Sequence, residues 1–300
     1  MQSRIPPTEA RNPRTTDLDR WPSEHVIRAI LAEDARGVAA AEAAADALAA
    51  AVEAALLRLT RGGRVHAFGA GASGRLAVLD ATEATPTFGA PAGLFSAHFP
   101  GGAAAFADSS IDLEDAEQLG RETAARALAP ADIAIGITAS GSTAYVAGAL
   151  AAARAAGALT ILICCDPGTP LALLVDHVVV ADTGAEAITG STRLKAGTAT
   201  KVLLNAFSTT LMVRAGRTYS NLMVDLVATN VKLRERAIGI VAAAAEVDRA
   251  EAEALLERAD GAVPLAIVHA RSGRNLDVCR RAISGGGGVR AALARLGAGA

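Results

Sequence analysis

The sequence has little net charge and few cysteines. Its 300 residues carry 29 Lys and Arg against 31 Asp and Glu, which gives a net charge of −2 at pH 7. A chain so balanced has no broad electrostatic attraction for nucleic acid or for an anionic membrane, so an anionic ligand would need a small local site. The 3 cysteines form no CxxC or histidine-rich pattern, so we expect neither a disulfide framework nor a bound metal.

Long apolar runs without charge are also missing. The longest alanine-rich stretch, residues 37–57, is interrupted by Glu42, Asp46 and Glu53 at roughly helical spacing, so it is not expected to cross a membrane. The first 22 residues are polar and contain proline, without the apolar segment of an export signal. We therefore expect a cytoplasmic protein with no membrane and no nucleic-acid partner.

Short apolar runs are present, and they alternate with longer segments of helical character. This is the pattern of successive βαβ units. The runs are apolar on both faces, which predicts a buried parallel sheet covered by helices on both sides. The five predicted strands are 64–68, 93–98, 132–137, 159–164 and 177–181. The adjacent Cys164 and Cys165 then fall at a strand end, where we interpret them as small apolar residues rather than as redox or nucleophilic groups.

The chain is predicted to have three parts. Residues 1–22 form an extended segment that lies over the rest, residues 23–240 form the main domain, and residues 241–300 form a small helical domain. The helices expected in the main domain are two within 23–57, split near Gly37, and then 191–212 and 222–240. Those expected in the last part are 245–259, 262–269, 275–283 and one from Val289 onward.

The first predicted strand runs into a glycine-rich loop, GAGASGR, over residues 69–75. In an open parallel sheet, ligands bind beyond the carboxyl ends of the strands. Glycines 69, 71 and 74 suit a dinucleotide-binding motif, but the acidic residue expected about twenty residues later is missing. A phosphate fits better, because it accepts hydrogen bonds from backbone N–H groups and from the Ser73 hydroxyl at a helix start.

Two further hydroxyl-rich clusters follow later strands. Residues 138–143, TASGST, come after the third strand, and residues 186–198 come after the last strand and place Arg193 and Lys195 beside several hydroxyls. Either of the first two loops alone could be ordinary capping of a helix start by serine or threonine, and the third could be a solvated helix start. Together, the clusters indicate a phosphate site.

Three long motifs resemble the signature stretches of the N-acetylmuramic acid 6-phosphate etherases: GAGASGRLAVLDATEATPTFG, EAITGSTRLKAGTATK and NLMVDLVATNVKLRERA. The resemblance implies a sugar isomerase (SIS) domain with a flavodoxin-like five-stranded sheet, a small helical UBA-like C-terminal domain, and a homodimer that needs no cofactor or metal. It also implies the reaction, in which the D-lactyl ether of the sugar phosphate is removed to give N-acetylglucosamine 6-phosphate and D-lactate.

The resemblance assigns roles to two carboxylates. The open-chain sugar carries an aldehyde that acidifies the C2 hydrogen, and the ether oxygen is on C3, so elimination needs a base and an acid. Glu114 corresponds to the base at C2 and Glu83 to the acid that protonates the departing lactate. The phosphate and substrate contacts carried over to this sequence are Gly71, Ser73, Ser140, Gly141, Thr143, Ser191, Thr192 and Lys195.

The sequence departs from the family pattern at a few of these positions. Ala84 and Thr85 stand where the family has C-P, and Ser142 stands where it has an arginine. These altered loops favour, as an alternative, a SIS isomerase or a lyase for a different phosphosugar. A second alternative is a sugar-phosphate-binding regulator without catalysis, which would not need both carboxylates.

Overall fold

The computed structural model describes residues 5–108, 110–226 and 230–299. The chain divides into two compact units. The first comprises Met1–Ala81 and Gly93–Ser208, and the second comprises Thr82–Ala92 and Thr209–Ala300. The domain boundary expected at residue 240 stays a prediction, and the two units are described separately below.

A parallel sheet of five strands forms the centre of the first unit, as the sequence predicted. The strands are β1 (Val65–Gly69), β2 (Phe95–His98), β3 (Ile133–Thr138), β4 (Leu159–Cys164) and β5 (His177–Val180). Their spatial order is β2-β1-β3-β4-β5, the order of flavodoxin-like sheets. Every residue of β1, β3 and β4 is buried, which explains why these strands are apolar on both faces.

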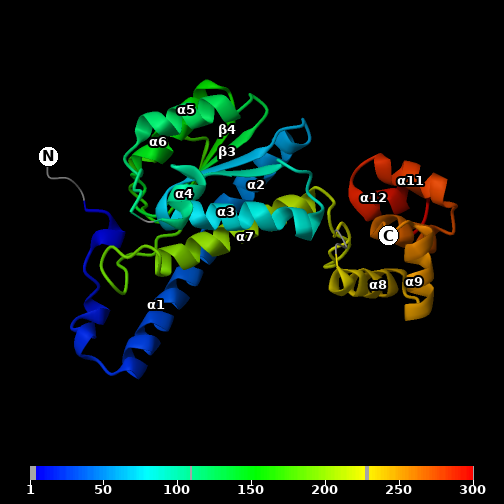
Figure 1. Ribbon diagram of the computed structural model, residues 1–300, viewed down its shortest axis with the longest axis horizontal. Coiled ribbons are helices and arrows are strands. Elements are labelled where there is room, and N and C mark those ends of the chain that lie inside the picture. Colours follow the sequence, from blue (N-terminus) through cyan, green and yellow to red (C-terminus); the bar gives the residue numbers. More distant parts are fainter. Residues whose placement is uncertain (1–4, 109, 227–229, 300) are drawn as a thin grey trace. The chain divides into compact units, whose positions relative to one another are not determined.

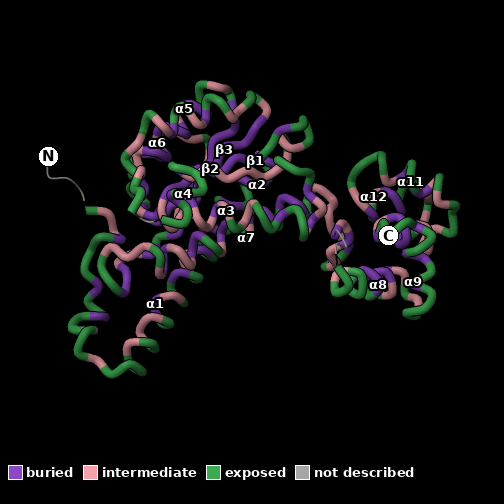
Figure 2. Tube along the Cα trace, in the orientation of Figure 1, coloured by how far each residue is buried: buried purple, intermediate pink, exposed green. Residues whose placement is uncertain are grey.

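Helices cover both faces of this sheet (Figure 1). On one side lie α5 (Glu117–Ala127) and α6 (Ala144–Ala155), and on the other lie α2 (Ala45–Leu59), α3 (Gly71–Phe88) and α7 (Lys195–Arg214). Helix α1 (Ser23–Ala43) precedes them, and the short α4 (Gly102–Ala107) follows β2. The central strands β1, β3 and β4 are buried along their whole length, whereas the edge strand β2 is only partly buried (Figure 2).

Helices α5 and α6 approach each other so closely that glycine is required on both. A Cβ at Gly120 of α5 would lie 1.9 Å from the carbonyl oxygen of Tyr145, and a Cβ at Gly148 of α6 would lie 2.0 Å from that of Glu117. Backbone therefore packs on backbone at this contact. Any side chain added at either glycine would push the two helices apart.

The break between the first two helices differs from the prediction. It lies at Ala44, and Gly37, where the break was expected, is a buried residue inside α1. The reason is tertiary packing, because a Cβ at Gly37 would lie 2.7 Å from the carbonyl oxygen of Lys195. This glycine permits a close approach of α1 to the start of α7 and does not end a helix.

We expect Gly37→Ala to destabilise the first unit by about 1–3 kcal/mol, because the added methyl group overpacks the contact with Lys195. Gly239→Ala on helix α8 (Val231–Ala245) is the matched control, since nothing lies within 4 Å of its Cβ position. The control should stabilise the second unit by about 0.5–1 kcal/mol through better helix propensity. Differential scanning calorimetry of both variants measures this, and equal effects of the two substitutions would contradict it.

The second unit is helical. Its helices are α8, α9 (Arg249–Arg258), α10 (Val263–Ser272), α11 (Leu276–Ser284) and α12 (Gly288–Arg295), and they bury a separate apolar core. The helix expected over 222–240 begins only at Val231, because the side chain of Asn230 accepts a hydrogen bond from the N–H of Leu233 and caps it there. Residues 227–229 of that expected helix lie outside the described residues.

Candidate functional site

Residues 69–75, the first loop of the prediction, are mostly helical, since only Ala70 lies between β1 and α3 and Gly71, Ser73 and Gly74 form the first turn of α3. The carboxylate of Glu114 lies beside this turn. Gly71 has a φ of +52°, and a Cβ at this position would lie 2.4 Å from Oε1 of Glu114. Glycine is thus required at position 71 both by its backbone conformation and by the carboxylate. The structure brings together two predicted site residues that are 43 positions apart in the sequence.

Gly71, Arg75 and Glu114 line one cavity of about 210 Å³. Partial burial of the Glu114 carboxyl, together with the nearby Asp112 and Asp115, raises its pKa, while the Arg75 cation acts in the opposite direction. The Glu114 carbonyl oxygen accepts a hydrogen bond of 2.9 Å from the N–H of Tyr145, which fixes its backbone to the start of α6. A carboxylate held this way is suited to accept a proton.

The second loop forms a row of hydroxyl groups. The hydroxyl of Thr143 lies 2.8 Å from that of Thr138, and the hydroxyl of Ser140 lies 3.1 Å from that of Ser142. Thr143 is the residue before α6, yet its side chain caps no helix N–H group. The Thr143 hydroxyl is therefore bound to Thr138 rather than to the start of α6, and its contact with a ligand stays a prediction.

Gly141 forms a tight contact between the second loop and Thr169. Its φ is +71°, and a Cβ here would lie 2.6 Å from that of Thr169. The Thr169 hydroxyl donates a hydrogen bond of 2.6 Å to the Gly141 carbonyl oxygen, which fixes the turn. The predicted residues Ser140, Gly141 and Thr143 therefore belong to one small, well-connected loop.

The third cluster is arranged differently from the first two loops. Glu186 is fully buried, and its carboxylate accepts hydrogen bonds from the N–H groups of Lys195 (3.0 Å) and Ala196 (2.8 Å). A carboxylate of the protein therefore occupies the N-terminus of α7, which explains why this helix starts at Lys195 and not at residue 191. Among the described residues, no hydrogen bond or ion pair joins Ser191 or Thr192 to the other two loops, although both stay partly exposed.

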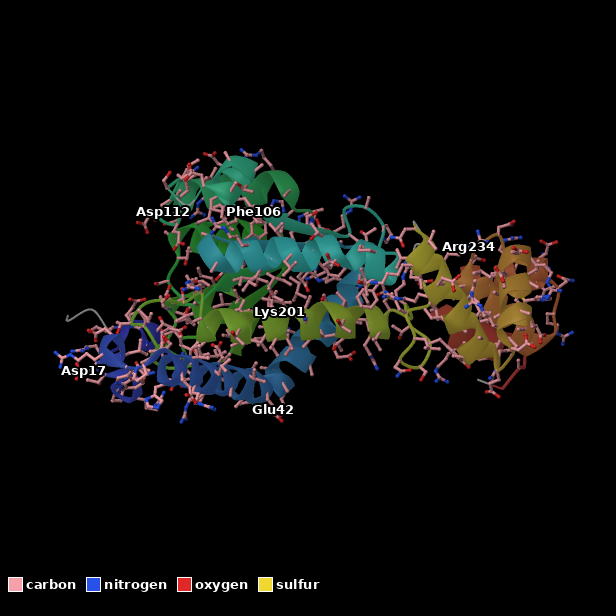
Figure 3. All side chains as sticks on the ribbon, turned by 60° about the horizontal axis from the view of Figure 1, so that its bottom comes forward. Asp17, Glu42, Phe106, Asp112, Lys201 and Arg234 are labelled. Atoms are coloured by element: carbon pink, nitrogen blue, oxygen red, sulfur yellow. The ribbon has the colours of Figure 1, made fainter. Side chains whose placement is uncertain are left out.

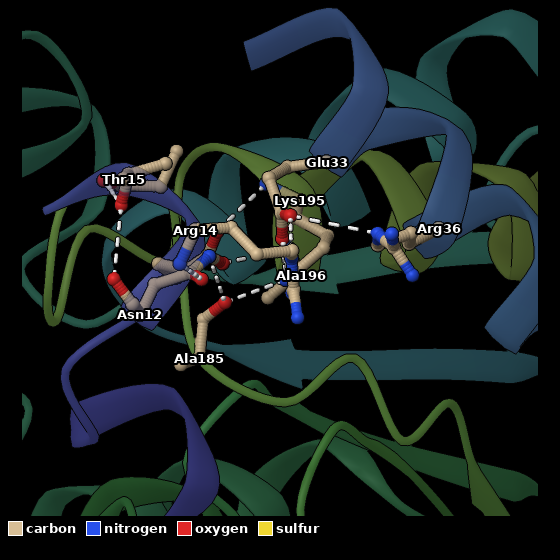
Figure 4. Close-up of polar contacts among 10 residues, drawn as sticks. Asn12, Arg14, Thr15, Glu33, Arg36, Ala185, Lys195 and Ala196 are labelled. Atoms are coloured by element: carbon tan, nitrogen blue, oxygen red, sulfur yellow. Dashed lines mark hydrogen bonds and ion pairs between the residues drawn. The ribbon is translucent and has the colours of Figure 1, made fainter. Parts of the chain in front are cut away.

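Lys195 lies in a buried ion-pair network. Its side chain is fully buried, and its ammonium group lies 2.6 Å from Oε2 of Glu33 and also donates to the carbonyl oxygen of Ala185 (Figure 4). Arg14 donates to the same Glu33, and the hydrogen bonds from Arg14 and then Lys195 lower the pKa of that carboxyl to about 2. The network fastens α7 to α1 and to the N-terminal segment, so we assign Lys195 a structural role. Its contact with substrate stays a prediction.

The N-terminal segment lies on the strand-to-helix connection of the third cluster. The Thr15 hydroxyl donates to the Ala187 carbonyl oxygen at 2.8 Å, and the Asn12 amide donates to the Ala185 carbonyl oxygen at 3.2 Å. Two of the side chains that face this connection, Thr15 and Asn12, are buried. The described part of this segment, which we expected to be extended, contains three short 3₁₀-helices, Pro7–Glu9, Pro13–Thr15 and Leu18–Arg20, and it is held against residues 185–190.

Glu83 belongs to the second unit and is described by itself. It lies on α3, is exposed, and is followed by the buried Ala84. The Thr85 hydroxyl donates to the Ala90 carbonyl oxygen at 3.1 Å, which stabilises the end of this helix around Pro86. The predicted acid is therefore on a helix and accessible to a ligand.

Arg75 is a residue of the site to which the sequence reasoning gave no role. Its guanidinium donates to the carbonyl oxygens of Phe106 (3.1 Å) and Ala105 (3.2 Å) at the end of α4. It also lies 5.2 Å from the ring centre of Phe99 and 5.9 Å from that of Phe106. The arginine directly after the glycine-rich loop was the available signal, and it anchors the segment that leads from β2 to Glu114.

A histidine pair joins β1 and β2, with His66 buried and His98 partly buried. Nδ1 of His66 on β1 is 3.0 Å from Nε2 of His98 on β2, and the rings are stacked. Burial lowers the pKa of both imidazoles, that of His98 to about 4. The lowered pKa values favour the neutral form of both rings, and the His98 ring also stacks on Phe68.

The cysteines at the end of β4 are buried, as expected from the apolar run. Burial raises the pKa of the Cys164 thiol to about 11 and that of Cys165 to about 12. Both thiols are protonated near neutral pH and are poor nucleophiles. Within the described ranges, no cluster of three or more His, Cys, Asp or Glu residues could hold a metal ion, and no helix has the length and apolarity needed to span a membrane.

The parallel sheet and its hydroxyl-rich loops define a protein of the SIS class. Residues 111–210 match the SIS domain, and residues 47–154 match the glucokinase regulatory protein N-terminal SIS domain. A solved phosphoheptose isomerase from Francisella tularensis is 18% identical, with a TM-score of 0.48 and coverage of 64% of this chain and 100% of that one.

Two curated relatives resolve the family. The chain is 51% identical over 263 residues to N-acetylmuramic acid 6-phosphate etherase of Thermobifida fusca, which covers 87% of this chain and 86% of that protein. It is 43% identical over 288 residues to the protein of the same name from Salmonella choleraesuis, which covers 95% and 97%. The chain belongs to the family of N-acetylmuramic acid 6-phosphate etherases.

Proposed function

We propose that this protein cleaves the D-lactyl ether of N-acetylmuramic acid 6-phosphate to N-acetylglucosamine 6-phosphate and D-lactate. Membership of the family supports the reaction. The observation that carries it in this chain is the Glu114 carboxylate, which lies directly over the first glycine-rich loop. This position supports the proposal, because a carboxylate can accept a proton and glycines at a helix start can bind a phosphate.

The phosphate is held by the first two loops. The N–H groups of the first loop and the hydroxyl of Ser73 bind it on one side, and Ser140, Gly141 and Thr143 bind it on the other. Ser191 and Thr192 add hydroxyl groups from the third cluster. These contacts are neutral hydrogen-bond donors, and the N-terminus of α3 adds a favourable dipole.

Glu114 acts as the base. It takes the proton from C2 of the open-chain sugar, whose aldehyde stabilises the resulting negative charge. The C3–O bond then breaks, a C2=C3 double bond forms, and Glu83 gives its proton to the departing lactate oxygen. Water then adds at C3 and gives its proton to the Glu83 carboxylate, and Glu114, whose proton has exchanged with solvent, protonates C2. The raised pKa of the Glu114 carboxyl makes it a stronger base than an ordinary glutamate.

The proposal includes a cytoplasmic homodimer that uses neither a metal nor an organic cofactor. The test is incubation of the purified protein with N-acetylmuramic acid 6-phosphate, with D-lactate followed by a D-lactate dehydrogenase assay. In H₂¹⁸O and in D₂O, the sugar product should carry one ¹⁸O at C3 and one deuterium at C2. Light scattering should give a mass of about 60 kDa, twice the 30.2 kDa of one chain. Tight binding of the sugar phosphate without release of lactate would contradict the proposed reaction.

A further inference from the structure

A second cavity opens in the first unit between α3 and α7. Its volume is about 510 Å³. The apolar side chains of Leu76, Leu79 and Val202 line it together with three cations, Arg75, Arg193 and Lys201. Within the part of the chain that the structure describes, no carboxylate lines it. Figure 3 shows Lys201 on α7, facing α3. We call this cavity the α3–α7 groove.

Two of the three cations are uncommitted. Arg75 is bound to the carbonyl oxygens of α4, but Arg193 and Lys201 make no hydrogen bond and no ion pair among the described residues. Both are exposed. Asp80 of α3, the carboxyl that Lys201 influences electrostatically, is hydrogen-bonded to the hydroxyl of Ser208 and does not line the groove. Unpaired cations around an apolar floor suit an anion that also carries an apolar group.

The α3–α7 groove continues from the site already described. It shares Arg75 with the cavity of Glu114, and Arg193 directly follows the hydroxyls of Ser191 and Thr192. Helix α3 carries Leu76 and Leu79 of the groove and, four residues further along, Glu83. The two phosphate loops contain hydroxyl groups and glycines without a free cation, so the cations of the groove are left for a second anionic group.

We propose that the α3–α7 groove binds the carboxylate-bearing ether arm of the substrate. Arg193 and Lys201 bind the carboxylate, and Leu76 and Leu79 pack against the methyl group next to it. This inference rests on the proposed function and adds a specificity site to it. A sugar phosphate without the arm would use the hydroxyl loops alone and leave the groove empty.

The test compares two ligands by calorimetry, each in a Glu114→Gln background that slows turnover by about 10²- to 10⁴-fold. N-acetylmuramic acid 6-phosphate carries the arm, and N-acetylglucosamine 6-phosphate does not. Replacing Arg193 and Lys201 by glutamine should weaken binding of the first ligand by about 10- to 100-fold, because two charge-assisted contacts are lost. Binding of the second ligand should change less than about twofold. Arg61→Gln, an exposed arginine in the turn before β1, is the matched control and should affect neither ligand.

Three outcomes would contradict the proposal that the α3–α7 groove binds the ether arm. They are an equal loss of both ligands, no loss of either, and a changed mass in light scattering without changed selectivity, which would make the groove an interface between copies of the chain. The proposed reaction fails separately. In a different outcome, the wild-type protein releases no lactate while the Arg193 and Lys201 variants still bind only the arm-bearing ligand more weakly. That result would support the binding role of the groove and contradict the proposed reaction.

Discussion

Glu114→Gln is expected to lower D-lactate release by about 10²- to 10⁴-fold, because glutamine cannot accept the C2 proton. The amide has the size of the carboxyl group, so it can lie over Gly71 as the carboxylate does. Binding of N-acetylglucosamine 6-phosphate should therefore stay within a few-fold of the wild-type value. Steady-state kinetics and calorimetry measure the two effects independently.

The neighbouring acids provide the controls. Asp112→Asn and Asp115→Asn remove charges that raise the pKa of Glu114, so kcat/KM should keep most of its value near neutral pH and its acidic limb should move to lower pH. Arg75→Gln removes the cation that lowers this pKa and should move the limb to higher pH. In the wild type, kcat/KM falls as the pH drops through the pKa of Glu114, since the protonated carboxyl is no longer a base. A Glu114→Gln variant as active as the Asp112→Asn variant would remove Glu114 from the mechanism.

Lys195→Met should destabilise the first unit by about 3–5 kcal/mol, the cost of breaking a buried ion pair from one side. The substitution leaves the buried Glu33 with one fewer partner and leaves the Ala185 carbonyl oxygen without the ammonium group (Figure 4). The melting temperature in calorimetry is the measurement. The difference in stability between variant and wild type should shrink as the pH falls from about 4.5, the usual pKa of a glutamate, toward 2. Over this range Glu33, whose pKa in the folded wild type is about 2, becomes protonated in both proteins, and the ion pair is lost.

Arg36→Met is the matched control for the buried pair. Arg36 lies 3.5 Å from the same Glu33 carboxylate, but its side chain is 59% exposed, so its loss should cost at most about 1 kcal/mol. The double variant Glu33→Leu/Lys195→Met removes both buried charges and should recover much of the stability. If Lys195→Met melts like the wild type but binds phosphosugar more weakly, Lys195 belongs to the substrate site and its structural assignment is wrong.

The sheet could be predicted closely because its signal is local. The strands of a buried parallel sheet are continuous apolar runs, so β4 was predicted at its observed bounds and the other strands to within two residues. Helix bounds that depend on distant residues could not be predicted in this way. Gly37 looked like a helix break, yet it faces the backbone of Lys195, which is 158 positions away in the sequence.

The candidate site likewise has features that the local sequence predicts and features that depend on residues far apart in the sequence. Loop composition pointed to Ser73 and to the second hydroxyl-rich loop, since glycine and hydroxyl residues after a strand are a local pattern, whereas Ser140 and Thr143 were assigned from the family resemblance. Composition could not reveal that the Glu114 carboxylate lies over Gly71, or that Glu186 occupies the N-terminus of α7. The role of Arg75 was missed for a similar reason, because its partners come from α4 and from the segment after β2.

The glycine contact between α5 and α6 sets a spacing at the site. Helix α5 begins three residues after Glu114, α6 begins directly after Thr143, and the two helices meet through backbone atoms at Gly120 and Gly148. The distance between Glu114 and the hydroxyl loop is therefore fixed by backbone packing between α5 and α6, and not by the side chains around this contact. Substitutions in the neighbouring core can change the stability of this helix contact, but they leave the distance that it sets unchanged. A variant for a longer or shorter sugar would need residues inserted or deleted between Glu114 and α5, whereas a different ether arm would need only new side chains in the α3–α7 groove.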